Sequence, residues 1–143
     1  MINAYFFYKI SHKLYKWKVP VLPSIVKLFC FLLYNSSIPF QCQLGRGTRF
    51  AYGAIGVVLH KRTIMGTNCV IGTNVTVGGR SGHYEVPVIG NNTFIATGAK
   101  VLGPITIGDN VVIGANAVVI KDIPNNCIVA GIPAKIIKKP DYE

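Results

Sequence analysis

Aliphatic residues recur at every sixth position along the middle of the chain, and most are followed by glycine or another small residue. The positions are Leu59, Met65, Ile71, Val77, Ile89, Ile95, Val101, Ile107, Ile113 and Val119. A helix repeats about every 3.6 residues and a flat strand every two, so neither explains a period of six. Short strands joined by tight turns do explain it, if each six-residue unit builds one face of a triangular prism. The pattern therefore predicts a parallel β-helix of hexapeptide repeats.

Three such units complete one coil of the prism, and the aliphatic anchors point into its interior. Each corner needs residues that accept a left-handed backbone, which glycine and asparagine do most readily. Residues of this kind follow the anchors at Thr67-Asn68, Asn91-Asn92 and Asp109-Asn110. Leu44 and Phe50 extend the series towards the N-terminus with a displacement of three residues. The predicted β-helix covers residues 37–123.

The flanking segments have a different character. Residues 1–36 are expected to form a short helical cap, and residues 124–143 a C-terminal tail that packs on the β-helix. Apolar residues follow one another at helical spacing in the cap, at Phe7, Ile10, Leu14 and Trp17. Pro20 and Pro23 end this helix, and a second helix is expected over residues 24–34.

One segment breaks the repeat, because His83 takes the place of an aliphatic anchor between Val77 and Ile89. A histidine inside so thin a prism costs free energy unless it is hydrogen-bonded. We therefore expect residues 79–87 to leave the coil as a loop. Its other polar side chains are candidates for binding an acceptor substrate: Arg80, Tyr84 and Glu85.

The charge of the chain narrows the range of partners. It carries 15 lysine and arginine residues against 5 acidic ones, a formal charge of +10, and no acidic residue precedes Glu85. Such a field favours phosphorylated cofactors and anionic lipid. Nucleic acid is not expected, because the basic residues are dispersed and no nucleic-acid motif accompanies them. The four cysteines, which have neither CxxC spacing nor a nearby histidine, are expected to be reduced, buried thiols.

The sequence also gives expectations about the cellular location of the protein and about metal binding. No apolar stretch reaches the roughly 20 residues of a membrane span, and residues 1–18 lack the pattern of a signal peptide. A cytoplasmic protein is expected, with contact between the basic cap and the inner face of an anionic membrane as a further option. No cluster has the spacing of metal ligands, so no metal is expected.

Four stretches of the coil resemble the hexapeptide acyltransferases, closest to their serine acetyltransferase branch and to relatives found in polysaccharide gene clusters. They are residues 77–79 (VGG), 99–103 (AKVLG), 113–119 (IGANAVV) and 130–135 (AGIPAK). The resemblance implies a left-handed β-helix, a homotrimer, and acetyl-CoA bound in the groove between two prisms. It also implies acetyl transfer to a hydroxyl group, of serine or of a sugar in a surface polysaccharide precursor, with a histidine as general base.

Residues 18 apart stack in one column if the coil is unbroken. The column formed by the residues that directly follow Leu59, Val77, Ile95 and Ile113 consists mostly of small side chains. It consists of His60, Gly78, Ala96 and Gly114, and the next column of Lys61, Gly79, Thr97 and Ala115. A strip of small side chains lets a thin thioester arm lie against the backbone and reach the imidazole. By resemblance, Gly79, Thr97 and Ala115 contact the pantetheine arm, while Lys121 and Lys135 meet the phosphates of the cofactor. Turn geometry alone is the alternative explanation for the small residues, and surface solvation for the lysines.

His60 is the first candidate for the general base, because it belongs to a rigid turn in register with that column. His83, in the loop, is the second. The Asp-His-Ala-Thr-Gly segment that supplies the base in serine acetyltransferases corresponds here to residues 52–56 (YGAIG). The acceptor therefore stays open between serine and a sugar. The alternative function is a non-catalytic structural or regulatory subunit, or a membrane-peripheral partner protein.

Overall fold

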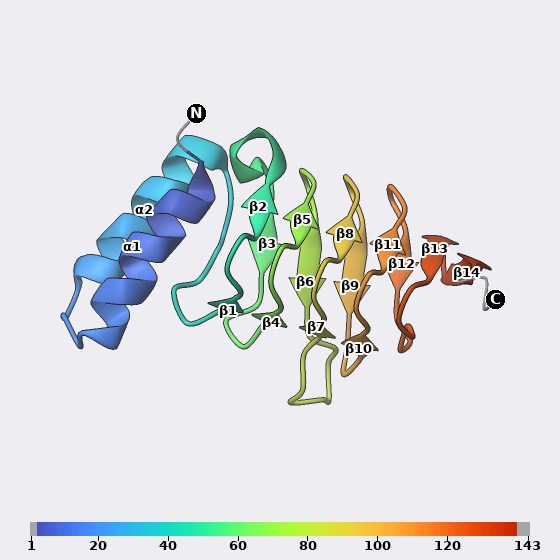
Figure 1. Ribbon diagram of the computed structural model, residues 1–143. Helices are drawn as coiled ribbons and strands as arrows, with labels where there is room; N and C mark the ends of the chain where they lie inside the picture. Colours follow the sequence, from blue (N-terminus) through green and yellow to red (C-terminus); the bar gives the residue numbers. More distant parts are fainter. Residues whose placement is uncertain (1–2, 140–143) are drawn as a thin grey trace.

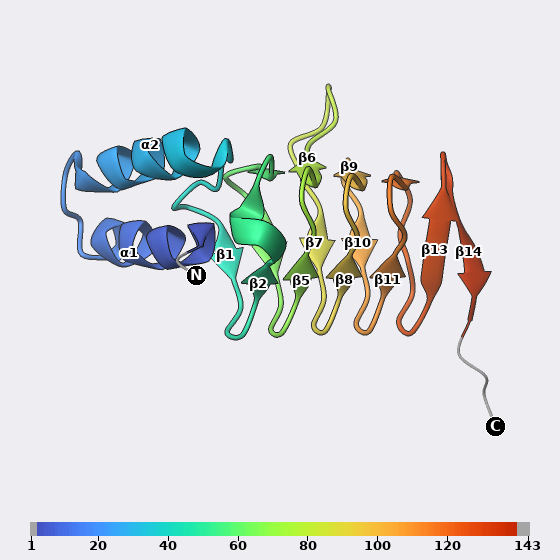
Figure 2. The same cartoon turned by 90° about the horizontal axis from the view of Figure 1, so that it is seen from above.

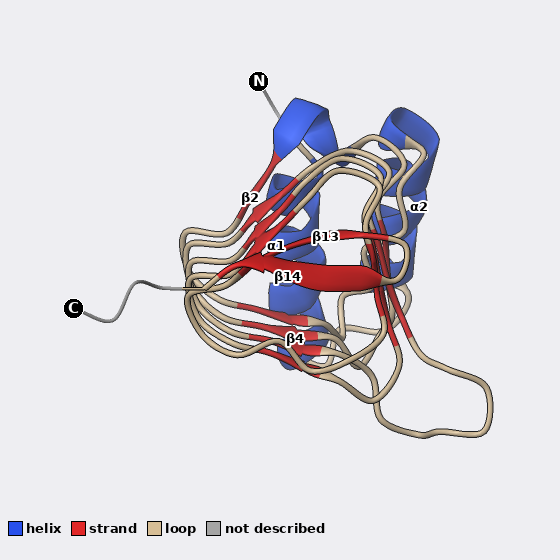
Figure 3. Ribbon diagram, turned by 90° about the vertical axis from the view of Figure 1, so that its right-hand side faces the viewer, coloured by secondary structure: helices blue, strands red, loops and turns tan. Residues whose placement is uncertain are grey.

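The computed structural model describes residues 3–139 as a parallel β-solenoid with two helices stacked on its N-terminal end (Figure 1). From above, the coils follow one another along a single axis, and a hairpin closes the far end (Figure 2). Along that axis the solenoid is triangular in cross-section, with one loop projecting from a corner (Figure 3). The predicted mainly-β hexapeptide prism is confirmed.

Each face of the prism is one sheet of short strands. The first face contains β1 (Gln43–Leu44), β4 (Ile64–Met65), β7 (Val88–Ile89) and β10 (Thr106–Ile107). The second contains β2 (Arg49–Phe50), β5 (Val70–Ile71), β8 (Phe94–Ile95), β11 (Val112–Ile113), β13 (Ile128–Gly131) and β14 (Ala134–Lys138). The third contains β3 (Val58–Leu59), β6 (Thr76–Gly78), β9 (Lys100–Leu102) and β12 (Val118–Val119). We name the corner that follows each face the first, second and third corner.

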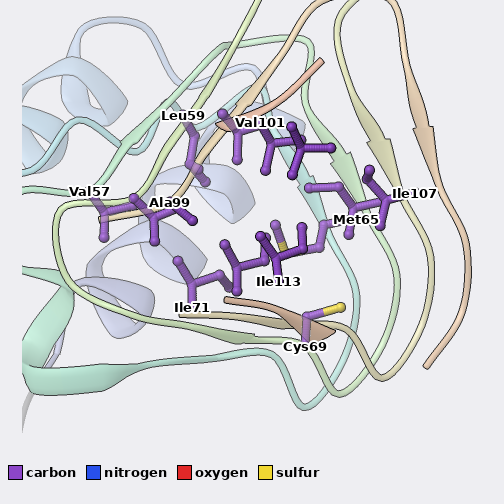
Figure 4. Packing of buried hydrophobic residues seen from close by; sticks show 14 of the residues in the cluster. Val57, Leu59, Met65, Cys69, Ile71, Ala99, Val101, Ile107 and Ile113 are labelled. Atoms are coloured by element: carbon purple, nitrogen blue, oxygen red, sulfur yellow. The ribbon is translucent and has the colours of Figure 1, made fainter. Parts of the chain in front are cut away.

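The aliphatic anchors fill the prism, as their spacing predicts. Every predicted anchor from Leu59 to Val119 is at most 2% exposed. The anchors of the three faces converge on one narrow core, in which Met65 and Ile107 face Ile113 and Val101 (Figure 4). Burying an aliphatic side chain of this size favours folding by about 1.5–3 kcal/mol. Because the anchors stack along the whole solenoid, each coil adds a similar free energy of burial to its stability.

The register differs from the prediction after the first coils. Val77 of β6 pairs with Leu59 of β3, 18 residues earlier, but with Val101 of β9, 24 residues later. The loop over residues 79–87 takes one hexad out of the coil, as expected of it. Every later residue therefore lies one face earlier than an unbroken repeat would place it. The predicted column is therefore wrong. His60 stacks with Gly78 on the third corner, whereas Ala96 and Gly114 lie at the second corner.

A second insertion explains the displaced anchors near the N-terminus. Phe50 pairs with Ile71, 21 residues on. The three extra residues are taken up by a turn at Ala51–Ala54, a 3₁₀ element in which Tyr52, Gly53 and Ala54 have left-handed backbones. This turn overlaps residues 52–56, the segment that corresponds to Asp-His-Ala-Thr-Gly in the resemblance described above.

The cap consists of α1 (Ala4–Lys16) and α2 (Leu22–Tyr34), which lie side by side against the first coil (Figure 2). Helix α1 begins at Asn3, whose side chain accepts a hydrogen bond from the backbone N–H of Tyr5. The buried residues of α1 are Ala4, Tyr8 and Ser11. The hydroxyl of Tyr8 donates to the carbonyl of Cys42 in the coil, which ties the cap to the solenoid.

At the other end, the tail continues the coil before it turns back. Strand β13 still pairs in parallel with β11, beyond the boundary expected at residue 123, and β14 then pairs antiparallel with β13. All four cysteines are free and buried, as expected. Within residues 3–139, no helix is both long and apolar enough to cross a membrane.

Candidate active site

His60 lies at the third corner, directly after β3, and its Nδ1 accepts a hydrogen bond from the backbone N–H of Arg62 at 3.1 Å. Burial, and then the charges of Arg62 and Lys61, lower the pKa of its imidazole. A backbone N–H can only donate, so the neutral ring carries its hydrogen on Nε2. In this state the ring can donate a hydrogen bond through Nε2 to a developing oxyanion, but has no free nitrogen lone pair to take up a proton.

His83 is exposed near the tip of the loop that leaves the same corner one coil later. Its backbone N–H donates to the carbonyl of Arg80 at 3.1 Å, which closes a tight turn. At the base of the loop, Val86 and Pro87 are buried. The loop therefore projects from a buried base at one corner of the prism (Figure 3), and His83 is exposed on it.

Arg62, which sequence reasoning missed, holds this loop against the coil. Its guanidinium donates to the carbonyl oxygen of Tyr84, and Cζ lies 4.0 Å from the centroid of the Tyr84 ring. Its Nε is buried without a hydrogen-bond partner. No local pattern marks such a contact, because it joins residues 22 positions apart through the stacking of coils.

A pocket of about 450 Å³ opens beside this contact. Its polar lining comes from the first coils and the loop: Gln41, Gln43, Lys61, Arg62, Tyr84 and Glu85. Amides, cations, a carboxylate and an aromatic ring together suit a small polar or saccharide ligand. Two of the three residues expected to bind an acceptor, Tyr84 and Glu85, line this pocket, whereas Arg80 does not.

A narrower groove of about 290 Å³ follows the third corner away from His60. Its lining residues are Gly79, Arg80, Leu102, Gly103, Pro104 and Ile120. In the observed register Gly79 stacks with Gly103, and Lys121 follows in the same column beside Ile120. We call Gly78, Gly79, Gly103 and Lys121 the third-corner strip. Gly103, which sequence reasoning missed, completes it.

The remaining candidates gather at the second corner. Gly72, Ala96, Gly114 and Ala130 stack there on successive coils, and we call them the second-corner strip. Thr97 lies one position outward, with its hydroxyl 3.4 Å from that of Thr73, and Ala115 follows one coil later. Lys135 of β14 is in register with Ala130, at the far end of the strip. One protomer thus carries two small-residue strips at different corners, each ending in a lysine.

Among residues 3–139, no group of three or more histidine, cysteine or acidic side chains could hold an ion. The groups at the third corner and in its loop are imidazoles, a guanidinium and backbone N–H groups, which can take up protons or stabilise negative charge.

Known proteins support the hexapeptide interpretation. A family model described as bacterial transferase hexapeptide (six repeats) matches residues 87–121. Serine acetyltransferase of Helicobacter pylori is 35% identical over 141 residues, which cover 96% of this chain and 81% of that protein. The chain belongs to the serine acetyltransferase family. The left-handedness expected of the solenoid follows from membership of this family.

Other similar proteins are longer than this chain. Serine acetyltransferase of Synechococcus elongatus is 40% identical over 133 residues, 91% of this chain but 54% of that protein. The solved serine acetyltransferase of Neisseria gonorrhoeae has a TM-score of 0.88 and 31% identity, and the match covers 98% of this chain and 55% of that one. Another serine acetyltransferase, solved in complex with CoA, has a TM-score of 0.85 and 28% identity over 94% of this chain and 55% of that one. The chain spans little more than half the length of these relatives.

Proposed function

We propose that this protein is an O-acetyltransferase that moves an acetyl group from acetyl-CoA to a hydroxyl group. The observation that carries the proposal is the match along most of the length of the Helicobacter pylori serine acetyltransferase. A structural neighbour in complex with CoA supports acetyl-CoA as the donor. The formal charge of +10 also favours a phosphorylated co-substrate.

The cofactor arm lies, in this proposal, in a groove between two protomers of a homotrimer. The third-corner strip of one protomer forms one wall, and the second-corner strip of its neighbour forms the other. In this arrangement all the small residues expected to contact the arm line the same groove, although within one chain they lie at two different corners. Lys121 and Lys135 then approach the phosphates from opposite walls as point charges.

The two histidines take different roles. His83 acts as the general base: it accepts the proton of the acceptor hydroxyl as the hydroxyl oxygen attacks the thioester carbonyl. His60, neutral with its hydrogen on Nε2, donates to the oxyanion of the tetrahedral intermediate. The C–S bond then breaks, CoA leaves as a thiolate, and the imidazolium of His83 returns the proton to its sulfur.

Serine is the first candidate acceptor, because the relatives are named serine acetyltransferases. A sugar hydroxyl is the second. It is favoured by the amide and aromatic lining of the pocket beside the loop and by residues 52–56, which lack the carboxylate and the imidazole of the family's segment.

An acceptor screen with acetyl-CoA tests the proposal through the release of free thiol, with serine, nucleotide sugars and oligosaccharides as acceptors. We expect acceptor-dependent thiol release that falls by about 10²-fold or more in kcat for His83→Ala. His60→Gln, which keeps an N–H donor, should retain more activity than His60→Ala. If His60→Ala abolishes turnover while His83→Ala affects only the acceptor KM, His60 is the base after all. Absence of thiol release with every acceptor would favour a non-catalytic subunit.

A further inference from the structure

Helix α2 exposes an apolar surface of unusual width. Seven of its large apolar residues are between 43 and 67% exposed: Leu22, Ile25, Leu28, Phe29, Phe31, Leu32 and Leu33. Only Pro23 and Cys30 of this helix are buried. At 100° per residue, the exposed set covers more than half of the helix circumference, and Lys27 is the only charged side chain of α2. Soluble proteins rarely leave so continuous an apolar surface in contact with water.

Helix α1, beside α2, continues this surface in a more polar form. Phe6, Ile10 and Trp17 share one exposed stripe at helical spacing, and Trp17 is 64% exposed. The apolar residues that predict this helix are therefore only in part the ones that pack on the coil. A second exposed stripe beside the first is basic, with Lys9, Lys13 and Lys16. The two helices together form a cap face with an apolar surface, a basic border and an exposed tryptophan.

We propose that this cap face lies in the interfacial region of an anionic lipid bilayer. Helices that lie in that region have a wide apolar face, lysines along its border and aromatic residues at the level of the headgroups. The charge of the cap selects this occupant, since no acidic residue precedes Glu85 in the chain. A second copy of the cap face would oppose lysines to lysines, whereas anionic headgroups neutralise them.

A cavity at the inner edge of α2 adds to this match. It has a volume of about 550 Å³ and lies between the helix and the first coil, with Lys27 next to Leu28, Phe31 and Phe40. A cation beside apolar and aromatic side chains suits the phosphate and the upper acyl chain of one lipid. The bilayer would then meet the end of the solenoid, and the two strips would stay in water.

Vesicle flotation tests this proposal on the full chain, with phosphatidylcholine vesicles that contain about 30% phosphatidylglycerol against phosphatidylcholine alone. We expect flotation with the anionic vesicles, weakened by salt. The sole tryptophan of the chain, Trp17, provides a second readout. Its emission should shift to shorter wavelength with the anionic vesicles and be quenched by brominated acyl chains.

The test variant is the double substitution Leu28→Glu, Leu32→Glu, which should reduce the bound fraction at least about tenfold and abolish the emission shift. The matched control is Ile132→Glu, Ile137→Glu, which adds the same charge at exposed positions of the opposite end. Because its net charge equals that of the test variant, it should still float with the anionic vesicles, close to the wild-type level. Circular dichroism checks that both variants are folded. Acetyl transfer to a soluble acceptor should be unchanged in both, which separates this proposal from the proposed activity.

Three results would overturn the proposal. The first is a wild-type chain that floats with neither kind of vesicle. The second is equal flotation of the test variant and the control. The third is a wild-type protein that does not bind vesicles, together with a Leu28→Glu, Leu32→Glu variant whose assembly has half the wild-type mass or less. That result would make the cap face an interface between copies of this chain.

Discussion

Two histidines of this chain are held by opposite kinds of backbone group. The Nδ1 of His60 faces the N–H of Arg62, which can only donate, at 3.1 Å. The Nδ1 of His12 lies 2.6 Å from the carbonyl oxygen of Phe40, which can only accept. The backbone thus dictates hydrogen on Nε2 in His60 and hydrogen on Nδ1 in His12.

Nitrogen-15 NMR of the side chains at neutral pH should therefore detect opposite neutral tautomers in these two rings. We also expect the titration midpoint of His60 to lie below that of a histidine in the urea-unfolded chain, because burial and then Arg62 and Lys61 lower its pKa. The unfolded state then binds a proton more readily, so acidification through this range weakens the folded state. A ring of His60 with hydrogen on Nδ1 would remove the donor role proposed for it.

We infer that Arg62 is a positioning residue, because its guanidinium donates to the carbonyl of Tyr84 and lies on the ring of Tyr84, next to His83 in the loop. In Arg62→Lys, the planar group that donates and stacks at once is lost, although the charge remains. We expect the KM for the acceptor to rise several-fold and the KM for acetyl-CoA to stay unchanged, with thermal stability close to the wild type. Arg49→Lys, which makes the same change at an exposed arginine of β2 outside the pocket, is the matched control. Equal effects of the two variants would refute the positioning role.

Among the structural elements, the first corner is built as a ladder of asparagines. Asn92, Asn110 and Asn126 have left-handed backbones, with φ of 54°, 56° and 60°. The amide of Asn92 donates to the side-chain oxygen of Asn110 at 3.1 Å, and Asn110 donates in turn to Asn126 at 2.9 Å. Each asparagine therefore accepts a strained turn conformation and links its coil to the next.

Replacing the middle asparagine separates these two contributions. Asn110→Ala loses both amide contacts. It also places alanine, which lacks the short polar side chain that makes asparagine tolerant of this conformation, in the left-handed region at a cost of about 1–2 kcal/mol. Asn110→Gly loses the contacts but accepts the backbone. Urea unfolding should rank the free energies of unfolding as wild type, then Gly, then Ala. If Gly and Ala are equally destabilised, the backbone conformation is not what the asparagine provides.

The strands and the loop could be predicted from the sequence, because the local pattern of apolar and polar residues determines them. The hexad spacing predicts the buried anchors from Leu59 to Val119, and His83 at an anchor position correctly marks the loop. The register was not predictable in the same way, because Val77 and Ile89 are two hexads apart in sequence and keep the phase of the repeat. Only the folded chain reveals that one of those hexads lies outside the coil, which moves Ala96 and Gly114 to another corner.

At the scale of the molecule, this register makes the assembly part of the proposed site. The third-corner strip and the second-corner strip lie at different corners of one prism, so a single protomer cannot bring them to opposite walls of one groove. In the proposed homotrimer, head-to-tail contacts would place the third corner of each protomer beside the second corner of the next. The homotrimer implied by the family would then hold three such grooves.

Mixing two inactive variants tests this arrangement. Gly78→Leu fills the third-corner strip, where a Cβ would meet only Leu102 at 3.5 Å and Thr76 at 3.9 Å, so folding should be preserved. Ala96→Phe fills the second-corner strip at a partly exposed position. Each variant alone should lose cofactor binding while sedimenting as a trimer. Unfolded and refolded together in equal amounts, they should recover about a quarter of wild-type activity, because one groove in four combines an unblocked strip from each variant. A groove formed within one protomer would recover nothing, since every chain in the mixture carries a blocked strip.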